Sequence, residues 1–346
     1  MSKRYIIPIF VPHLGCPNDC IFCNQKKITN RKQAVDKAEI VNVIETQLGY
    51  FPKSDNIKEI AFFGGSFTAI DRDLMIEYLD IARDYKRRKI VNCIRISTRP
   101  DAIDEEILDI LKEYGVDIIE LGVQSMDDEV LRMNNRGHDS NSVVRASKLI
   151  KNYGITLGHQ IMPGLYMDSF EKTVKSAKRL IELKPDIVRI YPTLIIKNTV
   201  LETLYNLKIY EPLSMNEAIE ISAILLKMFT ENNIKVIRVG LQVTENINLE
   251  NDVVAGPFHS AFRQLVEQKG YLNKQIEIFE EHNIKDKKEV VIYLDRKKIS
   301  YAVGNKGSNK KELMKRFNLE NIKYIPVDEE IFNLVKEDEV IEIGVL

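Results

Sequence analysis

The 346-residue sequence contains no uninterrupted apolar run of about 18 residues, and its N-terminus leads straight into a short strand-like segment. A membrane-spanning helix needs about 20 consecutive, mostly apolar residues, and a secretory signal needs an apolar stretch behind a basic start. Both features are missing. We therefore expect a cytoplasmic protein without a membrane partner.

An excess of charge of either sign is also missing, since 50 Lys and Arg residues balance 51 Asp and Glu residues, for a formal net charge of −1. Such a chain has no general attraction to nucleic acids or membranes, so binding to either requires a local patch. One basic stretch stands out: residues 285–323 contain twelve Lys and Arg residues against five Asp and Glu residues.

Cysteine is scarce, and three of the four cysteines, Cys16, Cys20 and Cys23, lie within eight residues. Three clustered thiols always leave one sulfur unpaired, and so few cysteines fit a reducing compartment better than a disulfide framework. Cys93 lies 70 residues further on, inside an apolar run, which disfavours a four-thiolate zinc site. Three thiolates suit a [4Fe–4S] cluster with one iron left open to a small ligand. A structural metal knuckle is the alternative interpretation.

Strand-like and helix-like segments alternate along the first two thirds of the chain. Alternating units of this length predict an α/β fold with a parallel sheet. Six such units indicate a partial (β/α)6 barrel, similar to a TIM barrel but open on one side. The expected strands are residues 6–11, 57–63, 93–97, 117–123, 155–162 and 186–190, with a further strand at 234–243.

The pattern changes near residue 251, so we expect a core domain at 1–250 and a separate C-terminal part at 251–346. This part begins with a helical connection and continues as a small basic α+β module. We expect one helix at 308–317 and short strands at 289–294, 299–303, 322–327 and 340–346.

Polar turns follow several expected strands, at the edge where parallel α/β folds bind their ligands. Gly64 and Gly65 end the second strand and allow a ligand to approach the backbone closely. Arg99 follows the third strand. Its planar guanidinium suits a carboxylate or phosphate, although an ion pair with Asp101 or Asp104 explains it equally well.

Two residues near the end of the sixth strand are candidate substrate contacts. Tyr191 could stack on a base or fill the end of the barrel, and Lys197 would sit near the barrel mouth, where it suits an anionic substrate.

The C-x3-C-x2-C spacing, with Phe22 just before the last cysteine, resembles the signature of the radical S-adenosylmethionine (SAM) superfamily. The resemblance implies that Cys16, Cys20 and Cys23 ligate a [4Fe–4S] cluster. It also implies that the fourth iron binds the methionine part of SAM, whose reductive cleavage yields a 5′-deoxyadenosyl radical. The turn at Gly64, Gly65 and Ser66 would then bind the methionine amino group, with Ser66 at a position where many members carry an acidic residue.

Several ordered motifs narrow this resemblance to the radical domain of the Elongator catalytic subunit, a tRNA uridine-modifying enzyme. It implies that Gln124 makes polar contacts with SAM and that Arg136 contacts its carboxylate. The motifs are residues 98–101, 122–125, 136–138, 162–164 and 190–194 within a resemblance covering about 5–260.

Two departures limit what this resemblance implies. Elongator-type enzymes separate their first two cysteines much more widely, and they carry a C-terminal acetyltransferase domain. Only about 90 residues follow the core here, too few for that domain. Acetyl transfer is therefore not expected.

The basic module contains a G-x-x-G turn, with Gly304, Lys306 and Gly307, ahead of the helix that carries Lys310. KH modules clamp a nucleic-acid backbone with such a loop, and a helix N-terminus favours phosphate. The preceding segment, 299–303, reads as a strand where a KH module has a helix. A solvated basic helix is the alternative.

We therefore expect an enzyme that uses a [4Fe–4S] cluster and SAM, with flavodoxin or ferredoxin as the electron donor, to modify a base in tRNA or another RNA. One alternative is a radical SAM enzyme acting on a small molecule such as a porphyrinogen, as in oxygen-independent coproporphyrinogen oxidases, which would need several arginines at the barrel mouth. Another is a non-catalytic iron–sulfur protein that binds RNA.

Overall fold

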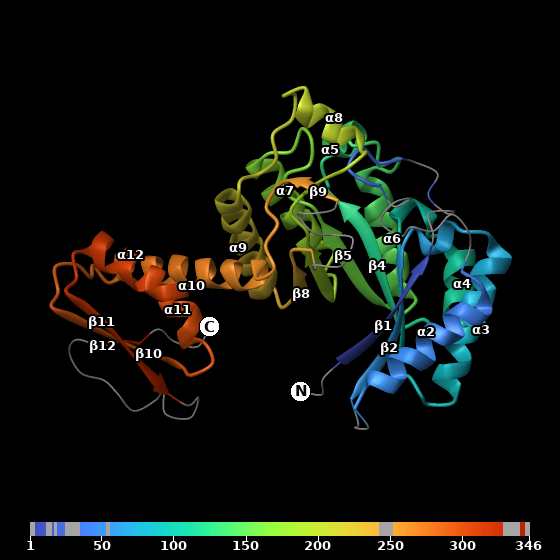
Figure 1. Ribbon diagram of the computed structural model, residues 1–346, viewed down its shortest axis with the longest axis horizontal. Helices are drawn as coiled ribbons and strands as arrows, with labels where there is room; N and C mark the ends of the chain where they lie inside the picture. The colour runs from blue at the N-terminus through green and yellow to red at the C-terminus, as the bar shows by residue number, and fades with distance from the viewer. Residues whose placement is uncertain are drawn as a thin grey trace. The chain divides into compact units, whose positions relative to one another are not determined.

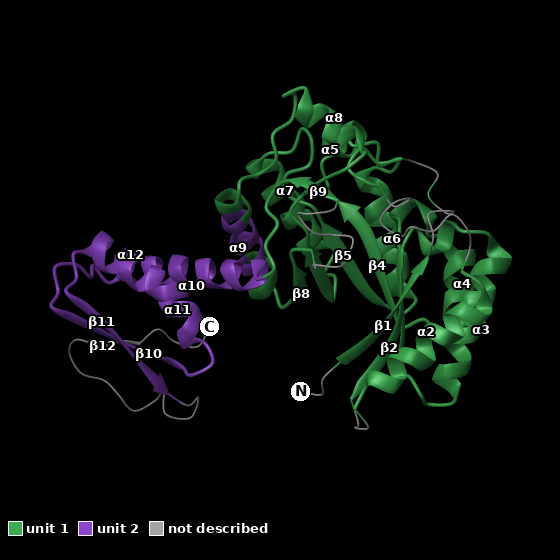
Figure 2. Cartoon of the chain, viewed as in Figure 1, with its two compact units in different colours: residues 1–218, 228–260 green, residues 219–227, 261–346 purple. Residues whose placement is uncertain are grey.

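The computed structural model describes residues 4–11, 16, 19–24, 35–52, 56–241, 252–327 and 340–342. The chain forms two compact units, shown in separate colours in Figure 2. Unit 1 comprises residues 1–218 and 228–260, and unit 2 comprises residues 219–227 and 261–346.

Unit 1 contains a seven-stranded sheet in the order β1-β2-β3-β4-β5-β6-β8, in which all neighbouring pairs are parallel (Figure 1). The expected α/β partial barrel is confirmed, and the strand expected at 234–243 forms one edge of the same sheet. The strands are β1 (Arg4–Val11), β2 (Ile57–Gly64), β3 (Cys93–Thr98), β4 (Ile118–Gln124), β5 (Thr156–Ile161), β6 (Ile187–Ile190) and β8 (Lys235–Val239).

The helices of this region begin at side-chain caps that the sequence supplies at nearly every start. Asp, Ser or Thr oxygens accept from backbone N–H groups of the first turn, which stabilises each helix by about 0.5–2 kcal/mol. At Ser214 and Glu217 the two bonds of a capping box are both present. The helices are α2 (Lys37–Tyr50), α3 (Arg72–Arg87), α4 (Glu105–Glu113), α5 (Asp128–Met133), α6 (Ser140–Asn152), α7 (Phe170–Glu182), α8 (Val200–Asn206) and α9 (Met215–Glu231).

One face of the sheet is apolar. Ile7, Ile9 and Val11 alternate along β1 and are almost completely buried. Alternation with a period of two places these side chains on the same face, which the helices cover. A short antiparallel pair, β7 (Ile195–Ile196) and β9 (Val253–Ala255), lies beyond the end of β6.

The opposite face of the sheet carries a row of buried ion pairs. Arg95 on β3 lies between Glu59 on β2, at 2.5 Å, and Glu120 on β4. Glu120 also pairs with Arg189 on β6, at 2.8 Å. Gly158 on the intervening β5 leaves room for this pair, because a Cβ atom there would lie 2.8 Å from Cγ of Glu120. We call these four charged side chains the ion-pair row.

Unit 2 is a small module built on a three-stranded parallel sheet in the order β11-β10-β12. Its core includes Phe279, Ile292, Leu313 and Ile322. Its elements are α10 (Phe262–Glu281), β10 (Glu289–Asp295), α11 (Ile299–Val303), a 3-10 turn (Asn305–Gly307), α12 (Ser308–Phe317), β11 (Asn321–Val327) and β12 (Val340–Glu342), together with residues 219–227 of α9.

The strand expected at 299–303 is wrong, because this segment is the helix α11. Its β-branched and aromatic residues favour a strand by composition, but packing against α10 decides its structure. Tyr301 stacks on Tyr271 of α10 at 5.9 Å, and Gln275 of α10 donates to the Ala302 carbonyl at 3.1 Å. The helix expected at 308–317 is confirmed. No described helix is long and apolar enough to cross a membrane.

Candidate functional site

The cysteine loop follows β1 and is anchored by hydrogen bonds from two other parts of unit 1. The Ile21 N–H donates to the Asn134 carbonyl at 3.2 Å, and Asn135 donates to the Asp19 carbonyl at 2.8 Å. Asn24 donates to the Lys197 carbonyl at 2.8 Å. The loop is therefore fixed between the end of α5 and the segment that precedes α8.

Cys20 is buried, whereas Cys16 and Cys23 are partly exposed. Burial raises the pKa of the Cys16 thiol, opposed by a hydrogen bond from the Ser66 N–H and by the Arg99 and Arg136 guanidinium groups. Within the described residues, no three Cys, His, Asp or Glu side chains converge as a binding site for a metal ion. These contacts bring the cysteine loop together with the Gly-Gly turn and two predicted site arginines.

The Gly-Gly turn packs directly against the end of β1. Gly64 has φ +106°, and a Cβ atom there would lie 2.6 Å from the Val11 carbonyl oxygen. The Gly65 N–H donates to that same carbonyl at 3.1 Å. A side chain at residue 64 would therefore push the turn away from the strand that leads into the cysteine loop.

Ser66 is buried, and its side chain is already engaged. Its hydroxyl lies 2.8 Å from the Thr98 hydroxyl and accepts from the Arg99 N–H at 3.2 Å. Ser66 therefore reaches the cysteine loop through its backbone N–H group, while its side chain ties the Gly-Gly turn to the end of β3.

Gln124 and Arg136 share the space above Gly122. A Cβ atom on Gly122 would lie 3.1 Å from Nε2 of Gln124 and 3.5 Å from Nη2 of Arg136. Arg136 donates to Sγ of Cys20 at 3.2 Å and to the Gly122 carbonyl at 2.6 Å. The structure thus brings Cys20, Gln124 and Arg136, three of the predicted site residues, near one another.

The backbone at Gln124 is strained. Its φ is +69°, in the left-handed region that non-glycine residues rarely adopt, and the pairing of β4 with β5 shifts register between Leu121 and Gln124. Such strain is often concentrated at functional sites, where it aims a side chain. Here it places a buried amide above Gly122, beside the guanidinium of Arg136.

Arg99 is 4% exposed and forms an ion pair with Asp101, which was the alternative to ligand binding by this residue. Its Nε and Nη2 atoms lie 3.0 and 2.9 Å from the carboxylate oxygens of Asp101. His138, which the sequence offered only as part of a motif, lies next to this pair, with Nδ1 3.9 Å from Asp101. Burial, followed by the charge of Arg136, lowers the pKa of His138 to about 3. His138 is therefore neutral at physiological pH.

Several buried polar atoms around this site have no partner within the part of the chain that the structure describes. They are Ser97 Oγ, Arg99 Nη1, Gln124 Oε1 and Arg136 Nε. An unsatisfied buried polar group costs about 1–3 kcal/mol, so these atoms indicate a missing ligand. Two guanidinium donors suit a carboxylate, and the amide oxygen suits an amine. This donor set fits the methionine end of SAM next to three thiols.

Tyr191 and Lys197 occupy different surroundings. The Tyr191 hydroxyl accepts from Arg189 at 3.0 Å, so this ring is tied to the ion-pair row and is half-buried. Lys197 is exposed, and its carbonyl accepts from Asn24 of the cysteine loop. The sequence interpretation missed the ion-pair row, although charged residues inside otherwise apolar strands are a recognisable signal.

The G-x-x-G turn of unit 2 connects α11 to α12. Gly304 has φ +77°, and a Cβ atom there would lie 2.8 Å from the Asn309 backbone nitrogen. Lys306 is exposed, whereas Lys310 is half-buried and donates to the side chain of Asn321 at 2.9 Å. Since residues 299–303 form a helix, a helix precedes and follows the turn, which removes the mismatch with a KH module.

Comparisons with known protein families agree with this geometry. The Radical SAM superfamily matches residues 10–177, and the Radical_SAM C-terminal domain matches residues 185–272. The chain belongs to the radical SAM superfamily. Membership implies a [4Fe–4S] cluster and SAM as cofactors, and it confirms the resemblance drawn from the cysteine spacing and the ordered motifs.

Two archaeal relatives refine the placement of this radical SAM enzyme. An uncharacterized protein of Methanocaldococcus jannaschii is 34% identical over 230 residues, covering 64% of this chain and 70% of that protein. The tRNA uridine(34) acetyltransferase of the same organism is 32% identical over 262 residues, covering 64% of this chain but only 48% of that protein. The chain thus aligns with about half the length of that acetyltransferase.

A solved structure shows the same fold. The archaeal Elp3 of Methanocaldococcus infernus, with an N-terminal deletion, superposes with a TM-score of 0.57 and 22% sequence identity. The match covers 84% of this chain and 66% of that one. At this identity the likeness concerns the fold alone.

Proposed function

We propose that this radical SAM enzyme modifies a base in tRNA. The observation that carries the proposal is the pairing of charges inside the barrel. In the ion-pair row, Arg95 and Arg189 are matched by Glu59 and Glu120. Arg4 on β1 also pairs with Glu59, at 2.6 Å. The arginines around these two carboxylates are therefore already engaged, which disfavours an anionic small molecule and suits a neutral ring. The similarity to a tRNA uridine(34) acetyltransferase supports the same class of substrate.

In this proposal Cys16, Cys20 and Cys23 would hold the cluster, and the turn at residues 64–66 would hold the methionine end of SAM together with Gln124 and Arg136. When bound and reduced by flavodoxin or ferredoxin, the cluster and SAM supply a 5′-deoxyadenosyl radical, which is the reactive group.

The protein's own residues orient these groups. Arg136 fixes Cys20 through its bond to the sulfur and fixes the end of β4 through the Gly122 carbonyl. Ser66 links the Gly-Gly turn to β3. Together these contacts keep the cysteine loop and the strand ends in one arrangement.

Unit 2 supplies a candidate RNA contact at the G-x-x-G turn. Gly304 and Gly307 adopt positive φ values, and Lys306 is exposed between them. A helix on each side matches the arrangement in which KH modules hold a nucleic-acid backbone. Lys310 would contribute its positive charge while its amine stays bonded to Asn321.

The porphyrinogen alternative requires several arginines free to bind carboxylates. Four arginines come into question, Arg99, Arg136, Arg189 and Arg238. Arg99 is paired with Asp101, Arg136 is bonded to Cys20 and Gly122, and Arg189 is paired with Glu120, whereas Arg238 on β8 has no ion pair among the described residues. These engagements argue against a substrate with several carboxylates. They do not bear on a non-catalytic iron–sulfur protein, which an activity measurement separates.

The decisive experiment compares tRNA nucleosides by mass spectrometry in a deletion strain complemented with the wild-type gene or with Cys20→Ala. We expect one modified nucleoside to disappear on deletion, to return with the wild type and to stay absent with Cys20→Ala. An unchanged nucleoside profile would overturn the proposal, and accumulation of a porphyrinogen would favour the small-molecule alternative. A reconstituted protein that forms no 5′-deoxyadenosine under dithionite would instead indicate a non-catalytic role.

A further inference from the structure

Helices α6 and α7 differ from the other helices of the barrel in charge. α6 contains three basic and no acidic residues, and α7 contains four basic and two acidic residues. Among the described helices from α2 to α9, the others are neutral or acidic; α4, for example, has one basic and four acidic residues. Positive charge is therefore concentrated on two consecutive βα units of a chain whose overall charge is −1.

The two helices present their cations at equivalent positions. Arg145 and Lys148 are the sixth and ninth residues of α6, and Lys175 and Lys178 are the sixth and ninth residues of α7. All four side chains are exposed, and the alternation of buried and exposed residues is identical in 141–150 and 171–180. We call these four residues the basic patch.

Direct bonds hold α6 beside α7, so the four cations share one outer surface. Arg179 of α7 donates to the Ser140 hydroxyl at the start of α6, at 3.2 Å. Lys151 near the end of α6 donates to the Lys184 carbonyl just beyond α7, at 3.0 Å. Residues three apart on a helix are neighbours along its axis, so the two cations of each helix lie side by side.

The other basic side chains of α6 and α7, those of Lys151, Lys172 and Arg179, already bond to other groups of the protein. The basic patch consists of the four that remain. Lys172 pairs with Glu129 at 2.7 Å, and Arg179 also donates to the Met126 carbonyl. By contrast, no carboxylate lies within 4 Å of Lys148, Lys175 or Lys178 among the residues described here. Arg145 contributes to the lowered pKa of Asp139, and Lys175 lines the same pocket as Asp127 and Asp128 without an ion pair to either.

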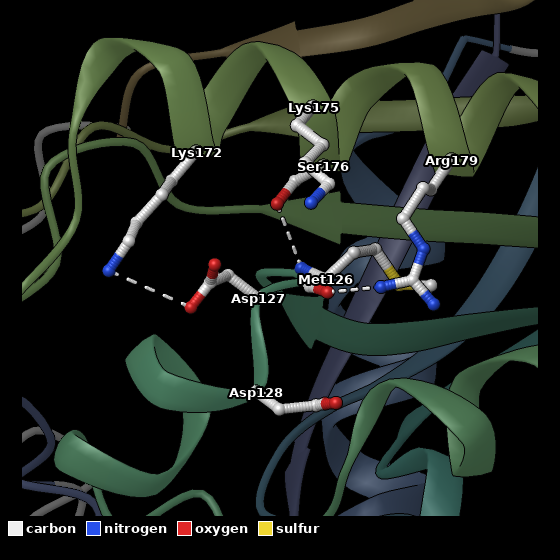
Figure 3. A pocket seen from close by; sticks show the side chains of 7 residues that line it. All are labelled: Met126, Asp127, Asp128, Lys172, Lys175, Ser176 and Arg179. Atoms are coloured by element: carbon white, nitrogen blue, oxygen red, sulfur yellow. Dashed lines mark hydrogen bonds and ion pairs between the residues drawn. The ribbon is translucent and has the colours of Figure 1, made fainter.

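A small pocket extends the basic patch toward the carboxyl end of β4 (Figure 3). Lys172, Lys175 and Arg179 line it from α7, and Asp127 and Asp128 line it from the β4–α5 turn. The Lys172 side chain points to Asp127, at 3.8 Å, and Arg179 points to Met126. Lys175 thus belongs both to the pocket and to the exposed surface, and it connects the basic patch to a pocket that also holds two carboxylates.

We propose that the basic patch binds the phosphate backbone of the substrate RNA, an inference that rests on the proposed function. Unpaired, exposed lysines on two adjacent helices suit phosphates, which position an RNA without reading its sequence. An acidic protein such as an electron donor is the competing occupant. RNA is favoured because the patch is two helices wide and lies on the catalytic unit of an enzyme proposed to act on tRNA.

The test measures the affinity of the anaerobically reconstituted full-length protein for bulk tRNA at several salt concentrations. For Lys175→Glu/Lys178→Glu we expect the Kd to rise at least tenfold and the slope of log K against log salt to fall by about two. Lys175→Gln/Lys178→Gln should show a smaller rise in the Kd. The control Arg87→Glu/Lys89→Glu makes the same charge change on neutral α3 and just beyond it, and should bind like the wild type.

Three outcomes would overturn the inference. If the wild type binds no tRNA, the inference and the proposed function fail together. If it binds tRNA and the patch variants bind within twofold of it, only the inference fails. If tRNA affinity is unchanged but SAM cleavage driven by reduced flavodoxin falls while dithionite-driven cleavage is normal, the patch binds an acidic electron donor instead.

Discussion

Gln124 combines an unfavourable backbone conformation with a buried side-chain oxygen that has no hydrogen-bond partner among the described residues. Gln124→Gly should remove the strain and leave the melting temperature unchanged or slightly higher, because glycine adopts positive φ without penalty. The same change should lower SAM affinity and the rate of 5′-deoxyadenosine formation under dithionite at least tenfold.

The matched control for this variant is Asn233→Gly, at a residue with φ +59° beyond the end of α9. It should have a similar effect on the melting temperature without changing SAM cleavage. Wild-type cleavage in Gln124→Gly would show that the strained amide serves the fold rather than the cofactor.

His159 predicts how stability depends on pH. It is completely buried on β5, and burial lowers its pKa to about 3. Below a pH of about 6.5, His159 becomes protonated in the unfolded chain but stays neutral in the folded protein. The stability that neutral His159 contributes is therefore fully present above this pH and is lost as the pH falls. His159 should contribute a loss of about 2 kcal/mol between pH 7 and pH 5.

Urea unfolding at both pH values measures this contribution. His159→Gln should lose less stability on acidification than the wild type, whereas Ser147→Ala, which removes only the hydroxyl 2.9 Å from the ring, should keep the wild-type slope. Parallel losses in wild type and His159→Gln would mean that His159 is not the titrating group.

The motif residues show which parts of the site the sequence could predict. Cys20, Gln124 and Arg136 were predicted because their motifs are local, and the structure brings these three side chains near one another. The engagement of Ser66 with Thr98 and of Arg99 with Asp101 depends on side-chain geometry between strands. From the sequence alone, ligand binding by Arg99 and an ion pair with Asp101 or Asp104 were equally good interpretations.

At the scale of elements, the ion-pair row ties four strands together and depends on the missing side chain at Gly158. Gly158→Ala should destabilise the protein by about 1–3 kcal/mol, because its Cβ atom would lie 2.8 Å from Glu120 and 3.0 Å from Ile187. Thermal unfolding of the reconstituted protein measures the effect.

Gly270→Ala is the matched control for this overpacking. Gly270 lies inside α10, and a Cβ atom there meets nothing within 4 Å. Alanine should therefore stabilise the helix by about 0.5–1 kcal/mol. If both variants shifted stability in the same direction, crowding at Glu120 would not be the cause in Gly158→Ala.

Strands and helices of unit 1 were predictable because their apolar periodicity and capping residues agree. Residues 299–303 were mispredicted because a five-residue segment has too little periodicity to overrule composition. Only its contacts with Tyr271 and Gln275 on α10, distant in the sequence, make it a helix.

At the scale of the whole molecule, the chain combines a catalytic unit with a second unit that bears the G-x-x-G turn. Lys306→Glu should weaken tRNA binding at least fivefold, because it reverses the charge of an exposed side chain in that turn, while 5′-deoxyadenosine formation without RNA stays at the wild-type rate. Gel-shift titration and a cleavage assay on the same preparation measure both quantities.

Lys297→Glu makes the same charge change in unit 2 at an exposed residue between β10 and α11. It should affect tRNA binding less than twofold. Equal losses in the two variants would assign the effect to the general charge of the unit rather than to the turn.

The ion-pair row also limits which substitutions related sequences can carry at these buried positions. Removing the Glu120 carboxylate alone leaves two buried guanidinium groups without it, which costs about 3–5 kcal/mol, whereas replacing the whole set of charges with apolar residues is often neutral or stabilising. Sister sequences that have lost Glu120 should therefore have lost both of its arginine neighbours as well. Those sequences should also tolerate alanine at the position of Gly158, because the Glu120 side chain that a Cβ atom would meet there is absent.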